Sequence, residues 1–375
     1  MHQVERAIFD IRRGLPIVLQ GQAGEYVLVQ PLEEVTESQL NDLVTLAGEA
    51  PGLVLSRHRL ALLQSSEDAE PGRLPLTMAA ARNRHYLYEL AVGANMSVSA
   101  VNERSSTATA SAEPASQADR TALALMRQAL LIPAALTAHV PASQRAVVDA
   151  RIADGTLLAV PVEQAARCAD ASGGRLKRVS EARVPLAESP DSRFILFREA
   201  DGLREHVAVL IGQPTSWSSV VPLRLHSACL TGDLFGSLRC DCGEQLRNAV
   251  ADIHAMGGGV LLYLAQEGRG IGLSNKLRAY ALQDIGHDTV DADQILGFGD
   301  DERGYQVAVD ILNQLAIQRV QLLTNNPLKM AALSEAGIEV IGRQAVYGRL
   351  TDHNHRYLST KADRGGHWLD DVFSG

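Results

Sequence analysis

The sequence predicts two domains of mixed helix and strand, in the range from α/β to α+β. A chain of 375 residues has the length of about two domains. Its second half alternates buried strands with amphipathic helices, which is typical of an α/β layer. Pro185, Pro190 and Asp191 interrupt the pattern near Ala187–Ser192. We therefore expect one domain over residues 1–190 and another over residues 191–375.

Short apolar segments and one clear helical period characterise the first half. Tyr26–Val29 and Leu53–Ser56 predict strands, and Glu37–Ala47 has the spacing of an amphipathic helix. Ser105–Ser116 is rich in Ser, Thr and Ala and predicts a mobile loop. This half has no dense cluster of carboxylates, histidines or thiols, so its composition predicts a folded α/β or α+β domain and no particular chemistry.

The second half predicts a strand at Arg193–Phe197 and then a regular alternation. A run of three glycines ends its first long helix, and Gly286 and Gly337 end two later ones. The expected helices cover 243–256, 275–285, 306–317 and 328–336, and the expected strands cover 260–264, 319–324 and 338–341. In such a layer the ligand loops lie at the ends of the strands.

Composition restricts the possible partners. A formal charge of −9 argues against a general surface for polyanions, so any anionic ligand must meet local basic groups. The first residues lack the basic and apolar regions of a signal peptide, and no uncharged apolar run approaches the roughly 20 residues that span a bilayer. We expect a soluble cytoplasmic protein without nucleic-acid or membrane partners.

Three of the four cysteines, Cys229, Cys240 and Cys242, lie close together in the sequence. Clustered thiols in a protein of this type are more often zinc ligands or nucleophiles than disulfides. Three thiolates leave a fourth tetrahedral position open for water, which is the arrangement that catalytic zinc needs. The alternative is a closed structural site with His226 or Cys168 as the fourth ligand.

A glycine-rich loop, Gln266–Gly272, follows the strand at 260–264. Its glycines allow close approach of the backbone to a ligand, and Arg269 can neutralise a phosphate. The glycine spacing does not fit the dinucleotide fingerprint, because the third glycine comes too early. A loop of this kind can also connect a strand to a helix without binding anything.

Two further loops carry charged groups. Asp300–Arg303 opens a helix, where an acid can act as a base, although such a pair is more often a solvated surface ion pair. Leu323–Lys329 joins a strand to a helix N-terminus and offers Thr324 and Lys329 to a phosphate. The alternative for this loop is a plain Asx turn before Pro327.

Taken together in this order, the motifs closely resemble GTP cyclohydrolase II. The resemblance covers about residues 193–370. The blocks that carry it are Arg224–Asp233, Ser237–Gly243, Gln266–Arg269, Arg278–Asp284, Asp300–Arg303 and Leu323–Pro327.

The resemblance implies the ligands and the roles of individual residues. Zinc would bind Cys229, Cys240 and Cys242, and Mg²⁺ would help to neutralise the triphosphate. Asp301 would be the proton acceptor, Arg303 the nucleophile at the α-phosphorus, and Tyr280 an aid at the imidazole ring. The GTP site would be lined by Arg224, Leu225, His226, Ser227, Ala228, Gln245, Glu267, Gly268, Arg269, Thr289, Thr324 and Lys329.

The implied reaction uses GTP and water and opens the guanine imidazole ring, in the first step of riboflavin biosynthesis. Zinc lowers the pKa of bound water, which can then attack C8 and release formate. Diphosphate leaves after attack at the α-phosphorus. The resemblance also implies a homodimer.

One position departs from the family pattern, because Ala228 stands where the family usually has Glu before the first zinc cysteine. This change motivates an alternative function, a paralogue that acts on another nucleotide or stops early. A further alternative is a non-catalytic scaffold or regulator stabilised by zinc. The joint presence of Tyr280, Asp301, Arg303 and Lys329 argues against a scaffold, which needs none of them.

The first half resembles 3,4-dihydroxy-2-butanone 4-phosphate synthase more faintly. The matching segments are Ala7–Gly14, Gly52–Leu55, Ala118–Thr121, Gly155–Leu157 and Gly174–Ser180. The acidic metal-binding loop of that family corresponds here to Gln20–Glu25, which contains a single carboxylate where Mg²⁺ requires several oxygen ligands. We expect a degenerate, inactive synthase-like α+β domain.

Overall fold

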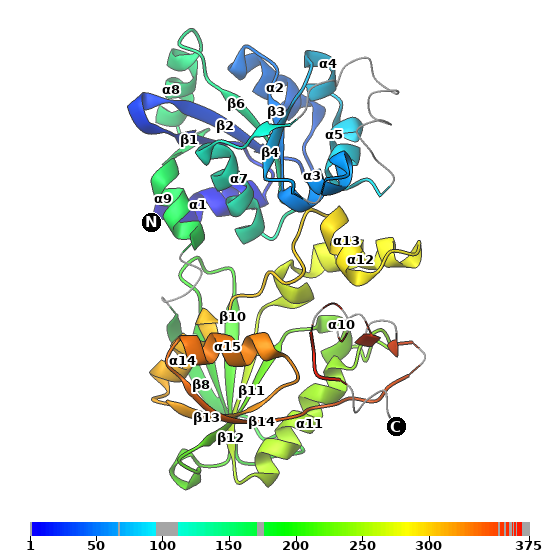
Figure 1. Ribbon diagram of the computed structural model, residues 1–375. Coiled ribbons are helices and arrows are strands. Elements are labelled where there is room, and N and C mark those ends of the chain that lie inside the picture. The colour runs from blue at the N-terminus through cyan, green and yellow to red at the C-terminus, as the bar shows by residue number, and fades with distance from the viewer. Residues whose placement is uncertain are drawn as a thin grey trace. The chain divides into compact units, whose positions relative to one another are not determined.

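The computed structural model describes residues 2–66, 68–94, 112–170 and 176–351, with parts of 353–369 (Figure 1). The chain forms two compact units, which confirms the prediction of two mixed domains. One comprises Met1–Ala171 with Leu277–Asp300, and the other Ser172–Lys276 with Asp301–Gly375. This division comes earlier than the predicted boundary at 190/191, because β8 (Lys177–Arg183) pairs with β9 of the second sheet.

The first unit is built on a seven-stranded sheet in the order β5-β4-β3-β6-β2-β1-β7. Only β1 and β7 are parallel, so this unit is of the α+β type. Its strands are β1 (Ile17–Gln20), β2 (Tyr26–Pro31), β3 (Gly52–Leu55), β4 (Gly72–Pro75), β5 (Glu113–Pro114), β6 (Ala134–His139) and β7 (Leu158–Pro161). Its helices are α1 (His2–Arg12), α2 (Glu37–Ala47), α3 (Arg57–Gln64), α4 (Met78–Ala81), α5 (Arg84–Val92), α7 (Gln117–Gln128), α8 (Arg145–Ala153) and α9 (Val162–Asp170).

Residues 277–300 belong to the first unit although they interrupt the second in sequence. They contain the end of α12 (Leu273–Asp284) and all of α13 (Thr289–Ile295). The buried guanidinium of Arg59 donates to the carbonyl of Ile295 and to three carbonyls at the end of α5. Glu33 pairs with Arg278 at 2.7 Å. These bonds explain why the segment is grouped with the first unit.

The second unit contains a mixed sheet in the order β14-β13-β11-β12-β10-β9-β8. The four strands β11 to β14 are parallel, and β8, β9 and β10 extend the sheet in antiparallel fashion beyond β12. The strands are β8, β9 (Ser192–Arg198), β10 (Glu205–Ile211), β11 (Val221–Ser227), β12 (Gly259–Leu264), β13 (Arg319–Leu323) and β14 (Glu339–Gln344). The helices are α10 (Leu230–Asp233), α11 (Cys242–Ala255), the start of α12, α14 (Gln306–Gln314) and α15 (Pro327–Glu335).

Both faces of this sheet are covered, so its central strands β11 and β12 are buried along almost their whole length (Figure 1). Ala208 and Leu210 belong to a core that includes residues of α14 and α15. Their neighbours Val209 and Ile211 pack in a second core with residues of α11. This alternation follows from the pleat, since successive side chains of a strand point to opposite faces.

The predicted elements of the second half are all present, with ends that shift by a few residues. The helix predicted at 306–317 stops at Gln314, for example, and the strand predicted at 338–341 extends to Gln344. The loop predicted at 105–116 falls mostly outside the described residues, and Glu113–Pro114 within it form β5. No helix in the described part of the chain is long and apolar enough to cross a membrane.

Candidate active site

The candidate site of the second unit lies where three parallel strands end. β12 lies on one side of β11 and β13 on the other, so the order of the chain reverses around β11. Such a reversal leaves a crevice at the carboxyl ends of the strands, where ligands of open α/β sheets bind. The cysteine segment follows β11, the glycine-rich loop follows β12, and Thr324 follows β13.

The three predicted cysteines come together at this edge. Their sulfur atoms all lie within 4.8 Å of one another, and the Sγ atoms of Cys229 and Cys240 are 3.6 Å apart. Tetrahedral zinc with Zn–S bonds of about 2.3 Å requires sulfur atoms about 3.8 Å apart. The spacing and the soft sulfur donors therefore fit a zinc ion held by Cys229, Cys240 and Cys242.

Gly232 in α10 provides the space around the sulfur atoms. A Cβ at this position would lie 2.7 Å from Sγ of Cys240 and 3.1 Å from Sγ of Cys229. No side chain fits at such distances, so glycine is required here for a steric reason. The backbone of Gly232 thus packs directly against the cysteine side chains.

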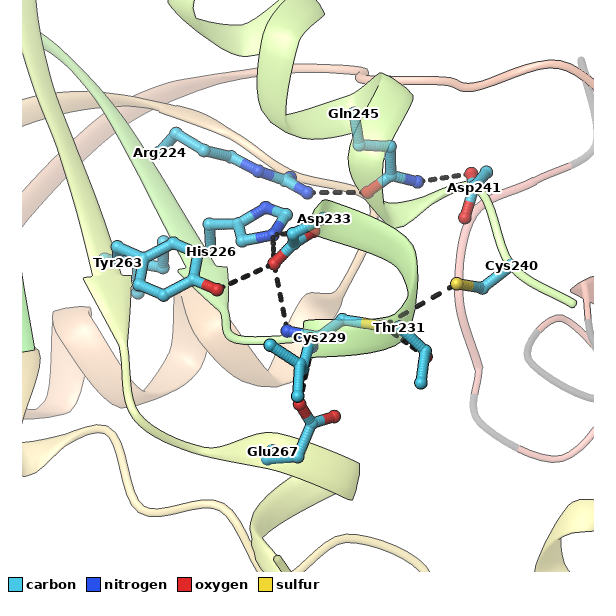
Figure 2. A network of polar contacts seen from close by, with 12 residues as sticks. Arg224, His226, Cys229, Thr231, Asp233, Cys240, Asp241, Gln245, Tyr263 and Glu267 are labelled. Carbon is cyan, nitrogen blue, oxygen red and sulfur yellow. Dashed lines mark hydrogen bonds and ion pairs between the residues drawn. The ribbon is translucent and has the colours of Figure 1, made fainter. Parts of the chain in front are cut away.

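Asp233 fixes the turn that carries Cys229 (Figure 2). Its carboxylate accepts hydrogen bonds from the backbone N–H of Cys229 at 2.9 Å and from the Tyr263 hydroxyl at 2.9 Å. Nε2 of His226 lies 3.1 Å from both carboxylate oxygens. Burial lowers the pKa of His226 although Asp233 opposes this, so the imidazole is neutral at pH 7 and donates Nε2–H to Asp233.

His226 is therefore engaged by Asp233 and is not a member of the cysteine cluster. Among the described residues, the only group of metal-binding side chains close enough to hold one ion consists of the three cysteines. The geometry thus differs from the closed site in which His226 would be the fourth ligand. Cys168 lies in α9 of the first unit.

Lys276, at the start of α12, joins the cysteines to the glycine-rich loop. Its Nζ lies 3.1 Å from Sγ of Cys229, 3.0 Å from Oγ1 of Thr231 and 2.7 Å from Oε1 of Glu267. The other oxygen of Glu267 accepts the backbone N–H of Leu230 at 2.6 Å. One buried ammonium thus connects residues that follow β11 with residues that follow β12.

The same contacts shift the pKa values of the thiols. Hydrogen bonds from Cys240 and Cys242, with the charge of Lys276, lower the pKa of the Cys229 thiol. The hydrogen bond to Cys229 in turn raises the pKa of Cys240.

Asp301 and Arg303 form a half-buried ion pair just before α14. Nε and a terminal nitrogen of Arg303 lie 2.8 and 2.5 Å from the two carboxylate oxygens, and the backbone N–H of Arg303 also donates to Asp301. Burial raises the pKa of Asp301, but these hydrogen bonds and the positive charge outweigh it and hold the pKa below its ordinary value. Asp301 is thus ionised and orients the guanidinium of Arg303.

Two further buried cations lie at the ends of the strands. Arg224 donates to the carbonyl of Leu323 at 2.8 Å and to Oε1 of Gln245 at 2.7 Å, and burial lowers its pKa to about 10. Nζ of Lys329 donates to the carbonyl of Leu225 at 2.7 Å. Both acceptors of Arg224 are neutral oxygens, and the nearby charges of Asp241 and Cys242 offset only part of the effect of burial on its pKa.

Several polar atoms around these cations have no hydrogen-bond partner within the described structure. They are Nε of Arg224, Nδ1 of His226, the hydroxyl of Tyr305 and Nδ2 of Asn326. Buried polar groups are normally hydrogen-bonded, so a cluster of exceptions requires an explanation. A polar ligand bound at this edge of the sheet would provide the missing partners.

The remaining predicted residues take varied positions. The side chain of Leu225 lies in the core and cannot face a ligand, and the backbone N–H of Ala228 bonds to the carbonyl of Leu264. Gly268 and Arg269 adopt positive φ angles of 63° and 59° in the loop after β12. The other predicted side chains of the second unit extend the site: Ser227 bonds to Gln266, and Thr324 accepts the N–H of Asn326.

Tyr280 and Thr289 are placed differently from the other predicted residues. Tyr280 lies on α12 and Thr289 begins α13, and both fall within the segment that belongs to the first unit. The structure therefore gathers the cysteines, Glu267, Arg224, Asp301, Arg303 and Lys329 in one unit, and Tyr280 and Thr289 in the other.

Sequence reasoning missed Lys276, Gly232 and Tyr305. Lys276 is 47 residues from Cys229, and no spacing rule connects the two. Gly232 was visible in the motif, but a glycine among other glycines carries no signal of its own. Tyr305 follows Arg303 by two residues and directly precedes α14, and no sequence pattern distinguishes it from a core tyrosine.

Comparisons with known proteins agree with this geometry. The family description "GTP cyclohydrolase II" matches residues 177–345. The GTP cyclohydrolase-2 of Azospirillum brasilense is 41% identical over 368 residues, which is 98% of this chain and 94% of that protein. The protein of the same name from Xylella fastidiosa (strain Temecula1) is 41% identical over 367 residues, which is 98% of this chain and 87% of that protein.

One solved structure gives only a weak structural match to this chain. RibBX, a two-domain 3,4-dihydroxy-2-butanone 4-phosphate synthase from A. baumannii, covers 92% of this chain and 99% of its own, at 18% identity and a TM-score of 0.36. A superposition at this level does not establish a shared fold. The sequence relatives, by contrast, extend over nearly the whole chain at 41% identity. The chain therefore belongs to the GTP cyclohydrolase II family.

Proposed function

We propose that this chain hydrolyses GTP to 2,5-diamino-6-(5-phosphoribosylamino)pyrimidin-4(3H)-one, formate and diphosphate, the first step of riboflavin biosynthesis. The observation that carries the proposal is a three-cysteine cluster that shares one sheet edge with the buried cations Arg224 and Lys329 and the half-buried Arg303. A metal site beside an anion site suits a substrate that has both a ring to be opened and a triphosphate.

The cysteines would hold zinc, which when bound activates water for attack on a ring carbon. The chain's own residues bind and orient the substrate. Arg224 and Lys329 neutralise phosphate oxygens, with Mg²⁺ accompanying the triphosphate, and the loop at Gly268 and Arg269 brings backbone close to the ligand. Thr324 and the N-terminus of α15 offer further donors.

Asp301 and Arg303 serve the phosphate chemistry in this proposal. A guanidinium is normally protonated and weakly nucleophilic, so attack at the α-phosphorus requires removal of its proton. Asp301 is the acceptor, because its carboxylate already contacts two nitrogens of Arg303. The lowered pKa of Asp301 makes this carboxylate a weak base. Transfer of the Arg303 proton to Asp301 therefore requires that bound substrate weaken the ion pair between the two side chains.

Incubation of the zinc-loaded protein with GTP and Mg²⁺ tests the proposal, with formate and diphosphate assayed separately. We expect both products, and we expect Arg303→Ala to lose diphosphate release. Near-normal turnover by Arg303→Ala would show that the nucleophile is wrongly assigned. Absence of formate from the zinc-loaded wild type would refute the ring-opening activity.

A second candidate function rests on Ala228, which replaces the usual Glu beside the first zinc ligand. Its methyl group supplies no carboxylate to orient water or substrate, so the chain could act on another nucleotide or stop at an intermediate. Identification of the product by mass spectrometry distinguishes this candidate. The expected product is the deformylated pyrimidine, and a formylated product would favour the second candidate.

For the first unit we propose a degenerate synthase-like domain that no longer makes dihydroxybutanone phosphate. Gln22 and Glu25 of the loop after β1 offer one carboxylate, and an amide is a far weaker Mg²⁺ ligand than a carboxylate. Formate release from ribulose 5-phosphate by the intact protein would overturn this proposal. We further propose that the protein works as a cytoplasmic homodimer, which sedimentation of the zinc-loaded protein would test.

A further inference from the structure

Tyr305 presents a buried hydroxyl that the proposed mechanism does not use. It directly precedes α14, and its side chain packs in the main core of the second unit with 7% exposure. The preceding carbonyl, of Gly304, is held by the side chain of Gln266. Within the described structure, the hydroxyl has no hydrogen-bond partner.

Two cationic side chains lie close to the ring of Tyr305. Cζ of Arg303 lies 5.9 Å from the ring centre and Nζ of Lys329 lies 6.0 Å from it. Burial, with a smaller contribution from the charge of Asp301, raises the pKa of Tyr305 to about 12, although the charges of Arg303 and Arg224 oppose this. The phenol therefore remains protonated at neutral pH and can donate its hydrogen.

A donor without an acceptor, next to three cations, indicates the kind of ligand that is missing. A phosphate offers several oxygen acceptors for the phenolic hydrogen, and its negative charge is attracted by the neighbouring Arg303 and Lys329. The apolar packing of the ring holds the hydroxyl in place before a ligand arrives. Such preorganised donors bind an anion at low entropic cost.

We propose that the hydroxyl of Tyr305 donates a hydrogen bond to a phosphate oxygen of the substrate's polyphosphate. This inference rests on the proposed function and adds one phosphate-binding residue to it. Tyr305 acts together with Arg303 and Lys329.

The assignment makes two opposite predictions for Tyr305→Phe. Removal of an unsatisfied buried hydroxyl leaves the ligand-free protein as stable as before or more stable. The same change weakens binding of a phosphate ligand by about 10- to 100-fold, the effect of losing one hydrogen bond to a charged group. If the hydroxyl had a purely structural role, Tyr305→Phe would lower the stability of the ligand-free protein and leave the affinity for a phosphate ligand unchanged.

The experiment measures thermal unfolding without ligand and the affinity for inorganic triphosphate by calorimetry, for wild type and Tyr305→Phe. Tyr26→Phe in the first unit serves as the control, because the Tyr26 hydroxyl only bonds to Gln20. Tyr263→Phe provides a contrast in stability, because its hydroxyl donates to buried Asp233. We expect Tyr263→Phe alone to lower the melting temperature.

Unchanged triphosphate affinity in Tyr305→Phe would overturn the inference, as would a lower melting temperature of that variant without ligand. If the wild type and Tyr305→Phe bind triphosphate equally well, only the role of Tyr305 is refuted. A wild type that binds no triphosphate refutes the phosphate site itself, and with it the proposed function.

Discussion

Gly232→Ala tests whether the cysteine cluster is a built metal site. The added methyl group would lie 2.7 Å from Sγ of Cys240, whereas ordinary contact begins at 3.4 Å. The sulfur must therefore move by about 0.7 Å, because the methyl group cannot move away from it toward Sγ of Cys229 or Cβ of Cys242, which both lie at 3.1 Å. Metal ligands have to lie within about 0.2 Å of their ideal distances, so this displacement is too large for the site to absorb.

The size of the effect follows from the cost of overpacking, which is about 1–3 kcal/mol. If the metal-bound form carries this strain, the zinc dissociation constant rises about 5- to 150-fold. Competition with a chromophoric chelator measures it. Gly342→Ala is the matched control, since a Cβ at Gly342 meets nothing within 4 Å. Wild-type zinc affinity in Gly232→Ala would show that the cysteines do not bind zinc as a cluster.

Three further predictions concern other buried charges. Lys276→Met should weaken zinc binding about 10- to 100-fold, which is the usual effect of removing a residue that orients a metal ligand. Lys177→Met on the exposed strand β8 is the control and should leave the zinc affinity unchanged. Equal zinc affinities of Lys276→Met and the wild type would exclude an orienting role for Lys276. The pKa of Asp301 in the folded protein lies below its ordinary value of 3.8. The ion pair with Arg303 therefore stabilises the folded protein above pH 3.8. This stabilisation is lost as the pH falls through the folded-state pKa. The difference in melting temperature between wild type and Asp301→Asn should therefore shrink below about pH 4, and a constant difference would contradict the assignment. Arg59→Met should destabilise the first unit by about 1–3 kcal/mol for each carbonyl left unsatisfied, as measured by urea unfolding. Zinc affinity, measured by chelator competition, should not change. An Arg59→Met variant as stable as the wild type would contradict this prediction.

The sequence by itself determined most of the secondary structure and the chemistry of the metal site. Glu37–Ala47 is a helix with the predicted ends, because a Thr36 capping box begins it and Gly48 ends it. These are local signals, carried by residues that are neighbours in the chain. The spacing of Cys229, Cys240 and Cys242 is also local, since a short turn and the start of α11 bring the sulfur atoms together.

The tertiary structure alone decided which distant residues meet. Lys276 reaches Cys229 because the strained loop after β12 turns the chain back, and this depends on positive φ angles that no periodicity reveals. Residues 277–300 are grouped with the first unit because Arg59 and Glu33, far away in sequence, bond to them. Such contacts depend on the order of the strands in the sheet and on the packing of distant segments. No local sequence signal specifies either of these.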